Sequence, residues 1–149
     1  MVNIGDYIQK DCMIELSGTE KNHAFQQIMA SIRKSNLLKD SNLFFEKILQ
    51  REEQSSTGIG LGVAIPHARV EDLSKTFIAI GRSAKGIDFS TPDDIPVRLI
   101  FMIGVSPEKA EYLKILSKIS GLVRNEEFRK QLLNCPSMND LFNLLISQS

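Results

Sequence analysis

The segment from Val97 to Gly104 (VRLIFMIG) constrains the fold more than any other part of the chain. It is short, rich in β-branched residues and apolar almost throughout, which is typical of a central strand that is covered on both faces. A second short segment, Thr76 to Gly81 (TFIAIG), predicts another strand. The stretch between them contains Pro92 and Pro96, which cannot donate to a sheet ladder, so we expect a loop or an edge hairpin there.

Helical periodicity precedes the two predicted strands. Apolar residues recur at intervals of three and four and predict a helix over residues 20–34, with Thr19 as its N-cap. A second helix is expected to begin near Asp40 or Ser41. Arg51 lies at its end, where a cation offsets the negative pole of the helix.

Three further helices are expected after the strands. They run over Glu108–Val123, over about Glu126–Leu133 with Asn125 as the candidate N-cap, and from Ser137 onward. Ser137 and Asp140 have the spacing of a capping box. Helices before and after a mixed sheet predict a layered α/β domain.

Length and charge exclude several classes of protein. A chain of 149 residues with 42% hydrophobic residues predicts one domain with one buried core. Lysine plus arginine number 18 and so do aspartate plus glutamate, so no overall field attracts nucleic acid or an anionic membrane. No apolar run approaches the ~18 residues of a membrane span. Cys12 and Cys135 lack a zinc spacing and no export signal is evident, so we expect two buried thiols and a cytoplasmic protein.

The segment from Ser55 to Pro66 (SSTGIGLGVAIP) breaks the helical pattern, because three glycines stand at every second position. It predicts a loop that leads into a short strand. Backbone N–H groups in such a loop can surround an anion. The segment does not end in the Gly-Lys-Ser/Thr of a P-loop, and no G-x-G-x-x-G leads into a helix. Nucleotide binding is therefore not expected, and a tight glycine loop without a ligand is the alternative.

His67 comes directly after this segment. Neutral histidine can act as a nucleophile near pH 7, since its ordinary pKa is about 6.5. A structural histidine at a strand edge is the alternative. Arg51 precedes the glycine segment, and the hydroxyls of Ser55, Ser56 and Thr57 lie between Arg51 and His67. A nucleophile, a cation and several hydrogen-bond donors together predict a phosphoryl site.

Other kinds of site have less support. A metal centre would need more than His23 and His67, and no carboxylate is spaced to join either of them. His23 is expected to be a solvated or capping side chain in the first turn of a helix. Glu52 and Glu53 are expected to be exposed at a helix end. The chain also lacks the local patterns of serine hydrolases and cysteine proteases.

The sequence REEQSSTGIGLGVAIPHA, from Arg51 to Ala68, closely resembles the active-site signature of the mannitol/fructose-type enzyme IIA domains (EIIA type 2) of the bacterial phosphotransferase system, including the nitrogen-regulatory members. The resemblance implies one domain over residues 1–149, with a mixed β-sheet sandwiched between helices. It implies that His67 accepts a phosphoryl group from phospho-HPr and passes it to an EIIB component, with no cofactor and no metal. By the same resemblance, Arg51 stabilises the phosphoryl group. The implied loop donors are Ser55, Ser56, Thr57 and Gly58.

Tyr112 stands where this family usually has a second histidine before a leucine. A tyrosine hydroxyl can donate a hydrogen bond to a phosphoryl oxygen, but it cannot become cationic at neutral pH. The alternative is that Tyr112 is simply the first apolar residue of a core-facing helix stripe. The function therefore has two readings: a phosphocarrier for a sugar-specific EIIB, or a free-standing regulatory protein whose phosphorylation on His67 controls protein partners.

Overall fold

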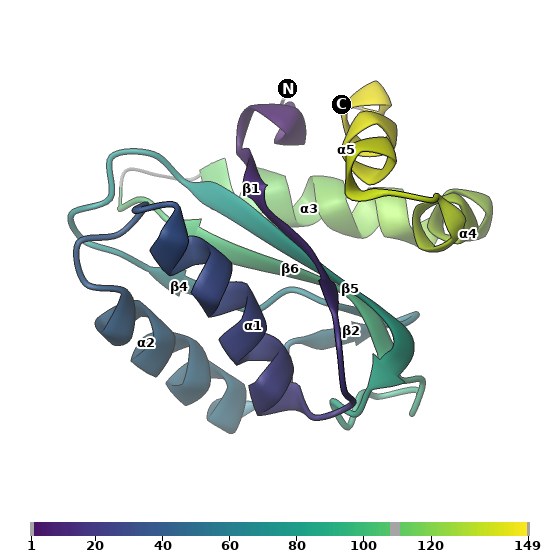
Figure 1. Ribbon diagram of the computed structural model, residues 1–149, viewed down its shortest axis with the longest axis horizontal. Coiled ribbons are helices and arrows are strands. Elements are labelled where there is room, and N and C mark those ends of the chain that lie inside the picture. Colours follow the sequence, from purple (N-terminus) through teal and green to yellow (C-terminus); the bar gives the residue numbers. More distant parts are fainter. Residues whose placement is uncertain (1, 108–110, 149) are drawn as a thin grey trace.

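A six-stranded mixed sheet is the middle layer of the computed structural model, which describes residues 2–107 and 111–148 (Figure 1). The elements run in the order η1 (Ile4–Asp6), β1 (Ile8–Leu16), α1 (Lys21–Lys34), α2 (Ser41–Gln54), β2 (Gly58–Gly60), β3 (Val63–Ala64), β4 (His67–Arg69), β5 (Phe77–Ile87), β6 (Val97–Val105), α3 (Glu111–Arg124), α4 (Glu126–Asn134) and α5 (Met138–Ser147). Among the described residues, none of the helices is long and apolar enough to cross a membrane.

Strand β6 organises the sheet. The strand order is β1-β5-β6-β3-β2, and β4 also pairs with β6. β5 runs antiparallel to β6, whereas β3 and β4 run parallel to it, with Val63 paired to Leu99 and His67 paired to Ile103. The central strand predicted at Val97–Gly104 is therefore confirmed, and it is one residue longer.

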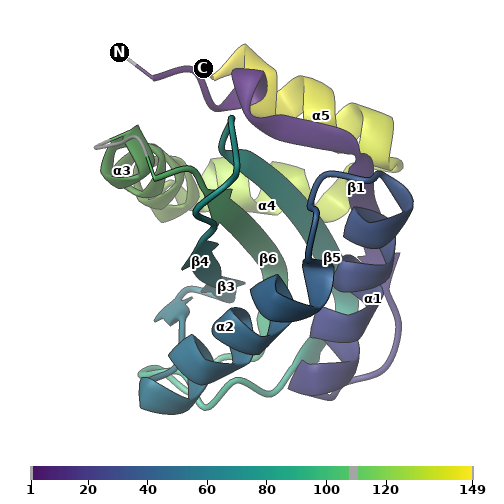
Figure 2. The same ribbon diagram turned by 90° about the vertical axis from the view of Figure 1, so that its left-hand side faces the viewer.

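Helices cover both faces of the sheet. α1 and α2 pack on one face and α3, α4 and α5 lie on the other (Figures 1 and 2). Alternate residues of β6 enter the two cores: Phe101 and Ile103 face the core with α3 to α5, whereas Ile100 and Met102 face the core with α1 and α2. All four side chains are buried, as expected for a strand with an apolar layer on each side. The predicted mixed sheet sandwiched between helices is confirmed.

Strand β1 was not expected from the sequence. It pairs parallel with β5 and buries Cys12 and Met13, but its register shifts between Ile8 and Met13. Buried positions along β1 therefore do not alternate strictly, and the charged Lys10 and Asp11 are exposed. This irregular pattern hides the strand from a search for period-two hydrophobicity.

Strand β5 corrects a second prediction. It runs from Phe77 to Ile87 rather than ending at Gly81, so the first part of the expected loop is strand. The register shifts between Arg82 and Ile87, and Gly86 has φ +93° in this irregular part. A bulge of this kind lets a polar segment remain in the sheet.

Most of the predicted helix caps are present. The side chains of Asn125 and Ser137 cap α4 and α5, as expected, and Asp40 caps α2, which begins at Ser41 within the predicted range. Thr19 is not the N-cap of α1: Glu20 holds that position without a side-chain hydrogen bond, and the carbonyl of Thr19 accepts from Asp88 N (3.2 Å). The predicted start of the third-to-last helix, Glu108, lies outside the described residues.

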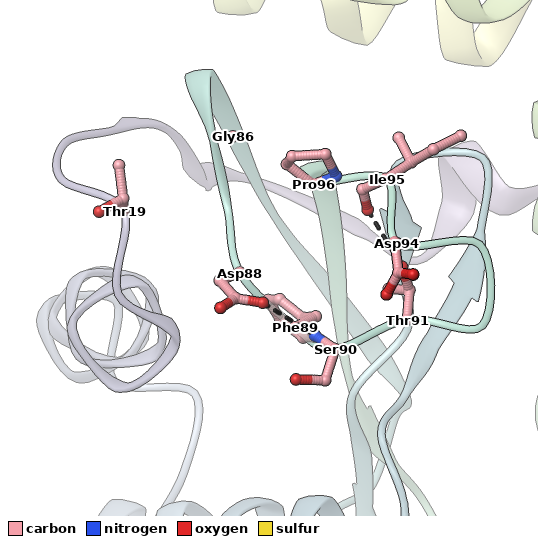
Figure 3. Close-up of a pocket in the computed structure, with 9 residues that line it drawn as sticks. All are labelled: Thr19, Gly86, Asp88, Phe89, Ser90, Thr91, Asp94, Ile95 and Pro96. Carbon is pink, nitrogen blue, oxygen red and sulfur yellow. Dashed lines mark hydrogen bonds between the residues drawn. The ribbon is translucent and has the colours of Figure 1, made fainter.

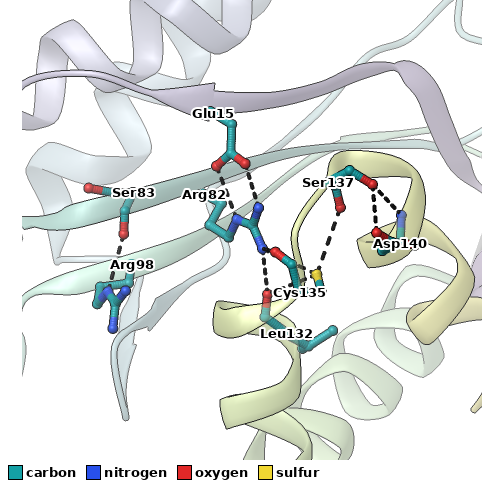
Figure 4. Close-up of polar contacts among 8 residues, drawn as sticks. All are labelled: Glu15, Arg82, Ser83, Arg98, Leu132, Cys135, Ser137 and Asp140. Atoms are coloured by element: carbon teal, nitrogen blue, oxygen red, sulfur yellow. Dashed lines mark hydrogen bonds and ion pairs between the residues drawn. The ribbon is translucent and has the colours of Figure 1, made fainter.

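Arg82 joins the sheet to the connection between α4 and α5 (Figure 4). The side chain is buried, and its Nε and Nη2 atoms donate to the Glu15 carboxylate. Nη1 donates to the carbonyls of Leu132 (2.8 Å) and Cys135 (2.9 Å). The hydrogen bonds to Glu15 raise the pKa of Arg82 further above its ordinary value. A permanently charged fork thus links β1, β5 and the C-terminal helices.

The two cysteines are free thiols. Cys12 is buried, as predicted, whereas Cys135 is only half-buried. The Sγ atom of Cys135 lies 3.2 Å from Nη1 of Arg82 and therefore belongs to the same polar cluster.

Candidate functional site

The glycine segment forms a small hairpin. β2 pairs antiparallel with β3, and the chain turns between them with positive φ at Gly60 (+87°), Leu61 (+61°) and Gly62 (+77°). A Cβ atom at Gly62 would lie 3.3 Å from the carbonyl oxygen of Pro96, so position 62 combines a strained backbone with little space. The expected loop before a short strand is therefore a hairpin, followed by β4.

Asp93 anchors this hairpin from the connection between β5 and β6. Its Oδ2 accepts from the backbone N–H of Leu61 (2.8 Å), and its Oδ1 accepts from Ile95 N (3.1 Å) and from the Thr91 hydroxyl (3.0 Å). The bond from Leu61, followed by that from Ile95, lowers the pKa of Asp93 below its ordinary value. The carboxylate is the form that these donors favour.

His67 is the first residue of β4. Its Nδ1 atom lies 2.9 Å from the carbonyl oxygen of Ile65. A carbonyl can only accept, so this contact requires the proton on Nδ1 and leaves Nε2 unprotonated in the neutral ring. Pairing of His67 with Ile103 of β6 holds the backbone beneath the ring. The local structure thus selects one tautomer, whose nucleophilic atom is Nε2.

His67 lines a cavity of about 140 Å³ with Arg69, Val105, Ser106, Pro107 and Tyr112. The ring centroids of His67 and Tyr112 are 6.4 Å apart and their planes are tilted by 34°. Tyr112 is half-buried and also packs against the core beneath α3. The structure therefore brings His67 and Tyr112 together, and Tyr112 also belongs to the core-facing stripe of its helix.

The first turn of α3 is tied to the N-terminal segment. The Tyr7 hydroxyl donates to Oε2 of Glu111 (2.6 Å), and Glu111 immediately precedes Tyr112. This hydrogen bond, together with partial burial, raises the pKa of Tyr7 to about 12. Tyr7 thereby restrains the helix turn that carries Tyr112.

Arg51 lies in the last turn of α2, as predicted. Its Nη1 atom donates to the carbonyl oxygen (2.9 Å) and the hydroxyl (3.3 Å) of Ser55. The described residues that line the His67 cavity do not include Arg51. The proposed role of Arg51 at the phosphoryl group thus remains a prediction.

The predicted loop donors have partners within the loop. The Thr57 N–H and hydroxyl donate to the Glu52 carboxylate, with a 2.6 Å bond from the hydroxyl. The Gly58 N–H donates to the Ser56 hydroxyl, which in turn donates to the carbonyl of Phe89. These bonds shape the loop between α2 and β2, and phosphoryl binding by its donors stays a prediction.

Glu52 is not the exposed residue that the sequence predicted. Its side chain is only 6% exposed and pairs with Lys21 of α1 at 2.7 Å. It thereby joins α1, the end of α2 and the loop through charged hydrogen bonds. No local sequence signal distinguishes it from the exposed Glu53.

Arg69 is the site residue that sequence reasoning missed. Alternation along β4 could have indicated it, because residues two apart in a strand share a face. The burial pattern agrees: His67 is half-buried, Ala68 is buried and Arg69 is exposed. Among the described residues that line the His67 cavity, Arg69 supplies the positive charge.

A larger cavity, of about 300 Å³, lies beside the connection between β5 and β6 (Figure 3). Its lining includes the carboxylates of Asp88 and Asp94, and its nine lining residues include no cation. Negative charge without a compensating cation is unfavourable for a phosphoryl group. The chemistry therefore favours the smaller cavity at His67 as the candidate phosphoryl site.

The second histidine lies elsewhere. His23 is exposed in the first turn of α1, where the sequence predicted it. Within residues 2–107 and 111–148, no group of three or more His, Cys, Asp or Glu side chains is placed to hold a metal ion.

Comparison with known proteins agrees with the fold and the signature. Residues 7–148 match the family described as "Phosphoenolpyruvate-dependent sugar phosphotransferase system, EIIA 2". The chain belongs to this family, and the resemblance drawn from Arg51 to Ala68 is confirmed.

Individual relatives carry both sugar-related and regulatory names. The fructose-specific EIIABC component of Bacillus subtilis is 37% identical over 133 residues, which are 89% of this chain and 21% of that protein. The fructose-specific EIIA component of Haloferax volcanii is 39% identical over 107 residues, 71% of this chain and 70% of that protein. The crystal structure of the nitrogen regulatory protein IIA-Ntr from Neisseria meningitidis superposes with a TM-score of 0.85 at 31% identity, covering 95% of this chain and 98% of that one. The chain thus spans about a fifth of the length of the Bacillus protein.

Proposed function

We propose that this chain is a phosphocarrier that accepts a phosphoryl group on Nε2 of His67 from phospho-HPr and passes it to an EIIB component. The observation that carries the proposal is the 2.9 Å contact between Nδ1 of His67 and the carbonyl of Ile65. It leaves Nε2 as the free nucleophile of a histidine that lines a cavity with a cation. Family membership supports a phosphotransfer role in general.

In the proposed step, the lone pair of Nε2 attacks phosphorus while the P–N bond to the donor histidine breaks. The donor ring leaves with the electrons of that bond, and a new P–N bond forms on His67. The carbonyl of Ile65 stabilises the positive charge that develops on the ring through Nδ1–H. Tyr112 donates its hydroxyl hydrogen to a phosphoryl oxygen, and Arg51 offsets charge on the transferring group from the end of α2.

Incubation with phosphoenolpyruvate, enzyme I and HPr, followed by intact-mass measurement, tests this proposal. We expect one acid-labile phosphoryl group on the unmodified chain and none on His67→Gln. His23→Gln is the matched control, since His23 is the other of the two histidines and is exposed on α1. A phosphoryl group retained by His67→Gln would contradict the assignment.

A regulatory role is the second candidate. Two observations favour it: similarity to a nitrogen regulatory protein over 95% of this chain, and a neutral tyrosine beside His67. In this reading His67 phosphorylation changes the surface that a protein partner contacts. Onward transfer separates the two roles. A carrier passes the phosphoryl group of His67 to a fructose-type EIIB, whereas a regulatory protein keeps that group when the EIIB is added.

We also propose one EIIA domain over residues 1–149 that works in the cytoplasm. The two free thiols support a reducing compartment. Cell fractionation tests the location, and limited proteolysis that yields no stable smaller fragment tests the single domain.

A further inference from the structure

Arg69 shares a strand face and a cavity with His67. The exposed and half-buried positions of β4 are Arg69 and His67, and the buried Ala68 between them points to the other side. Pairing of Arg69 with Val105 of β6 holds its backbone, and its carbonyl accepts from Lys47 of α2 at 3.1 Å. The backbone that carries the Arg69 side chain is therefore fixed, two residues after the proposed nucleophile.

The Arg69 guanidinium contacts a backbone carbonyl and a carboxylate. Its Nη2 atom donates to the carbonyl of Pro107 at 3.2 Å, and Pro107 lines the same cavity. Its Nε atom lies 3.6 Å from Oε1 of Glu71, and both side chains are more than half exposed, at 61% and 74%. An exposed ion pair of this length contributes little. The five donors of the fork can therefore turn toward a stronger anion at small cost.

Arg51 differs in its position. It is not among the described residues that line the His67 cavity, and its Nη1 atom donates to the carbonyl and the hydroxyl of Ser55. Tyr112 lines the cavity, but a phenol has no positively charged form. In this cavity the positive charge that could meet a phosphoryl group directly thus comes from Arg69.

We infer that Arg69 binds oxygens of the phosphoryl group carried by His67 and stabilises the phosphorylated protein. The inference rests on the proposed function. The hydrogen bond to Pro107 is the resting position of the guanidinium, and phosphorylation of Nε2 supplies a dianionic group that replaces the carbonyl as its partner.

The equilibrium of phosphoryl exchange with HPr tests the inference, because it separates contact with the phosphoryl group from contact with the partner. Loss of a docking contact slows the forward and reverse reactions equally and leaves the equilibrium constant unchanged. Loss of a contact to the bound phosphoryl group shifts the equilibrium toward phospho-HPr. For Arg69→Gln we expect a shift of about tenfold, as for the loss of one charge-assisted hydrogen bond. Arg69→Lys keeps the charge but loses the fork, so we expect a smaller shift.

Arg33→Gln is the matched control, since Arg33 is an exposed arginine of α1 whose guanidinium contacts Ser41 and Asn42. Its equilibrium constant should equal that of the unmodified chain. Thermal unfolding verifies that Arg69→Gln and Arg69→Lys fold. If Arg69→Gln becomes phosphorylated and its equilibrium constant for exchange with HPr is unchanged, the role of Arg69 is overturned while the proposed function stands. A slower exchange rate does not alter that conclusion. An unmodified chain that takes no phosphoryl group from phospho-HPr overturns the proposed function as well.

Discussion

Tyr112 combines two tasks in one side chain, because it packs on the α3 core and lines the His67 cavity. Tyr112→Phe should keep the fold and lose only a neutral hydrogen bond, worth about 0.5–1.5 kcal/mol. We therefore expect its phosphohistidine to be lost about two- to tenfold faster. Tyr112→His adds a donor that becomes cationic at lower pH, so its transfer rate relative to the unmodified chain should be higher at pH 6 than at pH 8.

Quenched-flow measurement of transfer from phospho-HPr, followed by decay of the isolated phosphoprotein, provides both quantities. Equal rates and equal pH dependence in all three proteins would show that Tyr112 is a packing residue with no part in the chemistry.

Tyr7 should titrate unusually late. The hydrogen bond to Glu111 raises its pKa from 10.0 to about 12. A raised pKa means that the folded chain favours the neutral phenol, so this stabilisation is complete below pH 10 and is lost as the pH rises toward 12. In a Tyr112→Phe background Tyr7 is the one remaining tyrosine, because the chain has 2. Its phenolate absorbance should have a midpoint near pH 12, and Glu111→Gln should move that midpoint toward 10; equal midpoints would rule out the hydrogen bond.

The chemistry-bearing residues differ in how well the sequence reveals them. His67 is detectable because it ends a long local signature, and Tyr112 because it departs from a known pattern. Arg69 lies on the cavity side because side chains alternate between the two faces of β4. This strand is three residues long, which is too short to show a periodic pattern in the sequence. Glu52 accepts hydrogen bonds from Lys21 and Thr57, and a contact with a separate helix such as that of Lys21 leaves no trace in the local spacing.

At the scale of elements, the β2–β3 hairpin depends on one carboxylate of the β5–β6 connection. The pKa of Asp93 is lowered, so its contribution is complete above its ordinary pKa and is lost as the pH falls through the lowered value. The difference in thermal stability between the unmodified chain and Asp93→Asn should therefore be largest near neutral pH and shrink in acid. Amide hydrogen exchange at Leu61 should accelerate over the same acidic range.

Asp94→Asn is the control for this experiment. Asp94 is the exposed neighbour of Asp93, and its positive φ (+58°) suits asparagine as well as aspartate. If Asp94→Asn removed the acid-dependent loss of thermal stability and Asp93→Asn preserved it, the anchoring role of Asp93 would be refuted.

Elements that local patterns encode were predictable, and elements that distant partners stabilise were not. β6 and the caps of α2, α4 and α5 follow from apolar runs and capping residues within a few positions. β1 and the second half of β5 instead depend on each other. Arg82 of β5 remains in the sheet because Glu15 of β1 meets its charge, and this pair is 67 positions apart in sequence. A search within a short window cannot detect such a pairing.

At the scale of the whole molecule, Arg82 forms a polar link between the sheet and the C-terminal helices. Arg82→Met should lower the free energy of unfolding by about 1–3 kcal/mol, because the buried carbonyl of Leu132 and the partly buried carbonyl of Cys135 lose a charged donor. Glu15→Gln should cost less, since the Glu15 side chain is 54% exposed and can regain water. Urea unfolding measures both values, and phosphorylation at His67 serves as the control for an intact site. A larger loss for Glu15→Gln than for Arg82→Met would contradict this account.

β3 and β4 pair along the same edge of β6, and this arrangement limits where residues can be inserted into the chain. Ile103 donates its N–H to the carbonyl of Pro66 at 2.9 Å, so even the step between the two short strands is tied to β6. One extra residue between positions 63 and 67 would shift this pairing by one place and turn the imidazole toward the opposite side of the sheet. Extra residues in the connection before Val97 would leave the pairing of β4 with β6 intact, but they would release the β2–β3 hairpin if they moved Asp93 away from Leu61. Protein engineers can therefore lengthen that connection only where Asp93 keeps its place, whereas the short path from Val63 to Arg69 must keep its length.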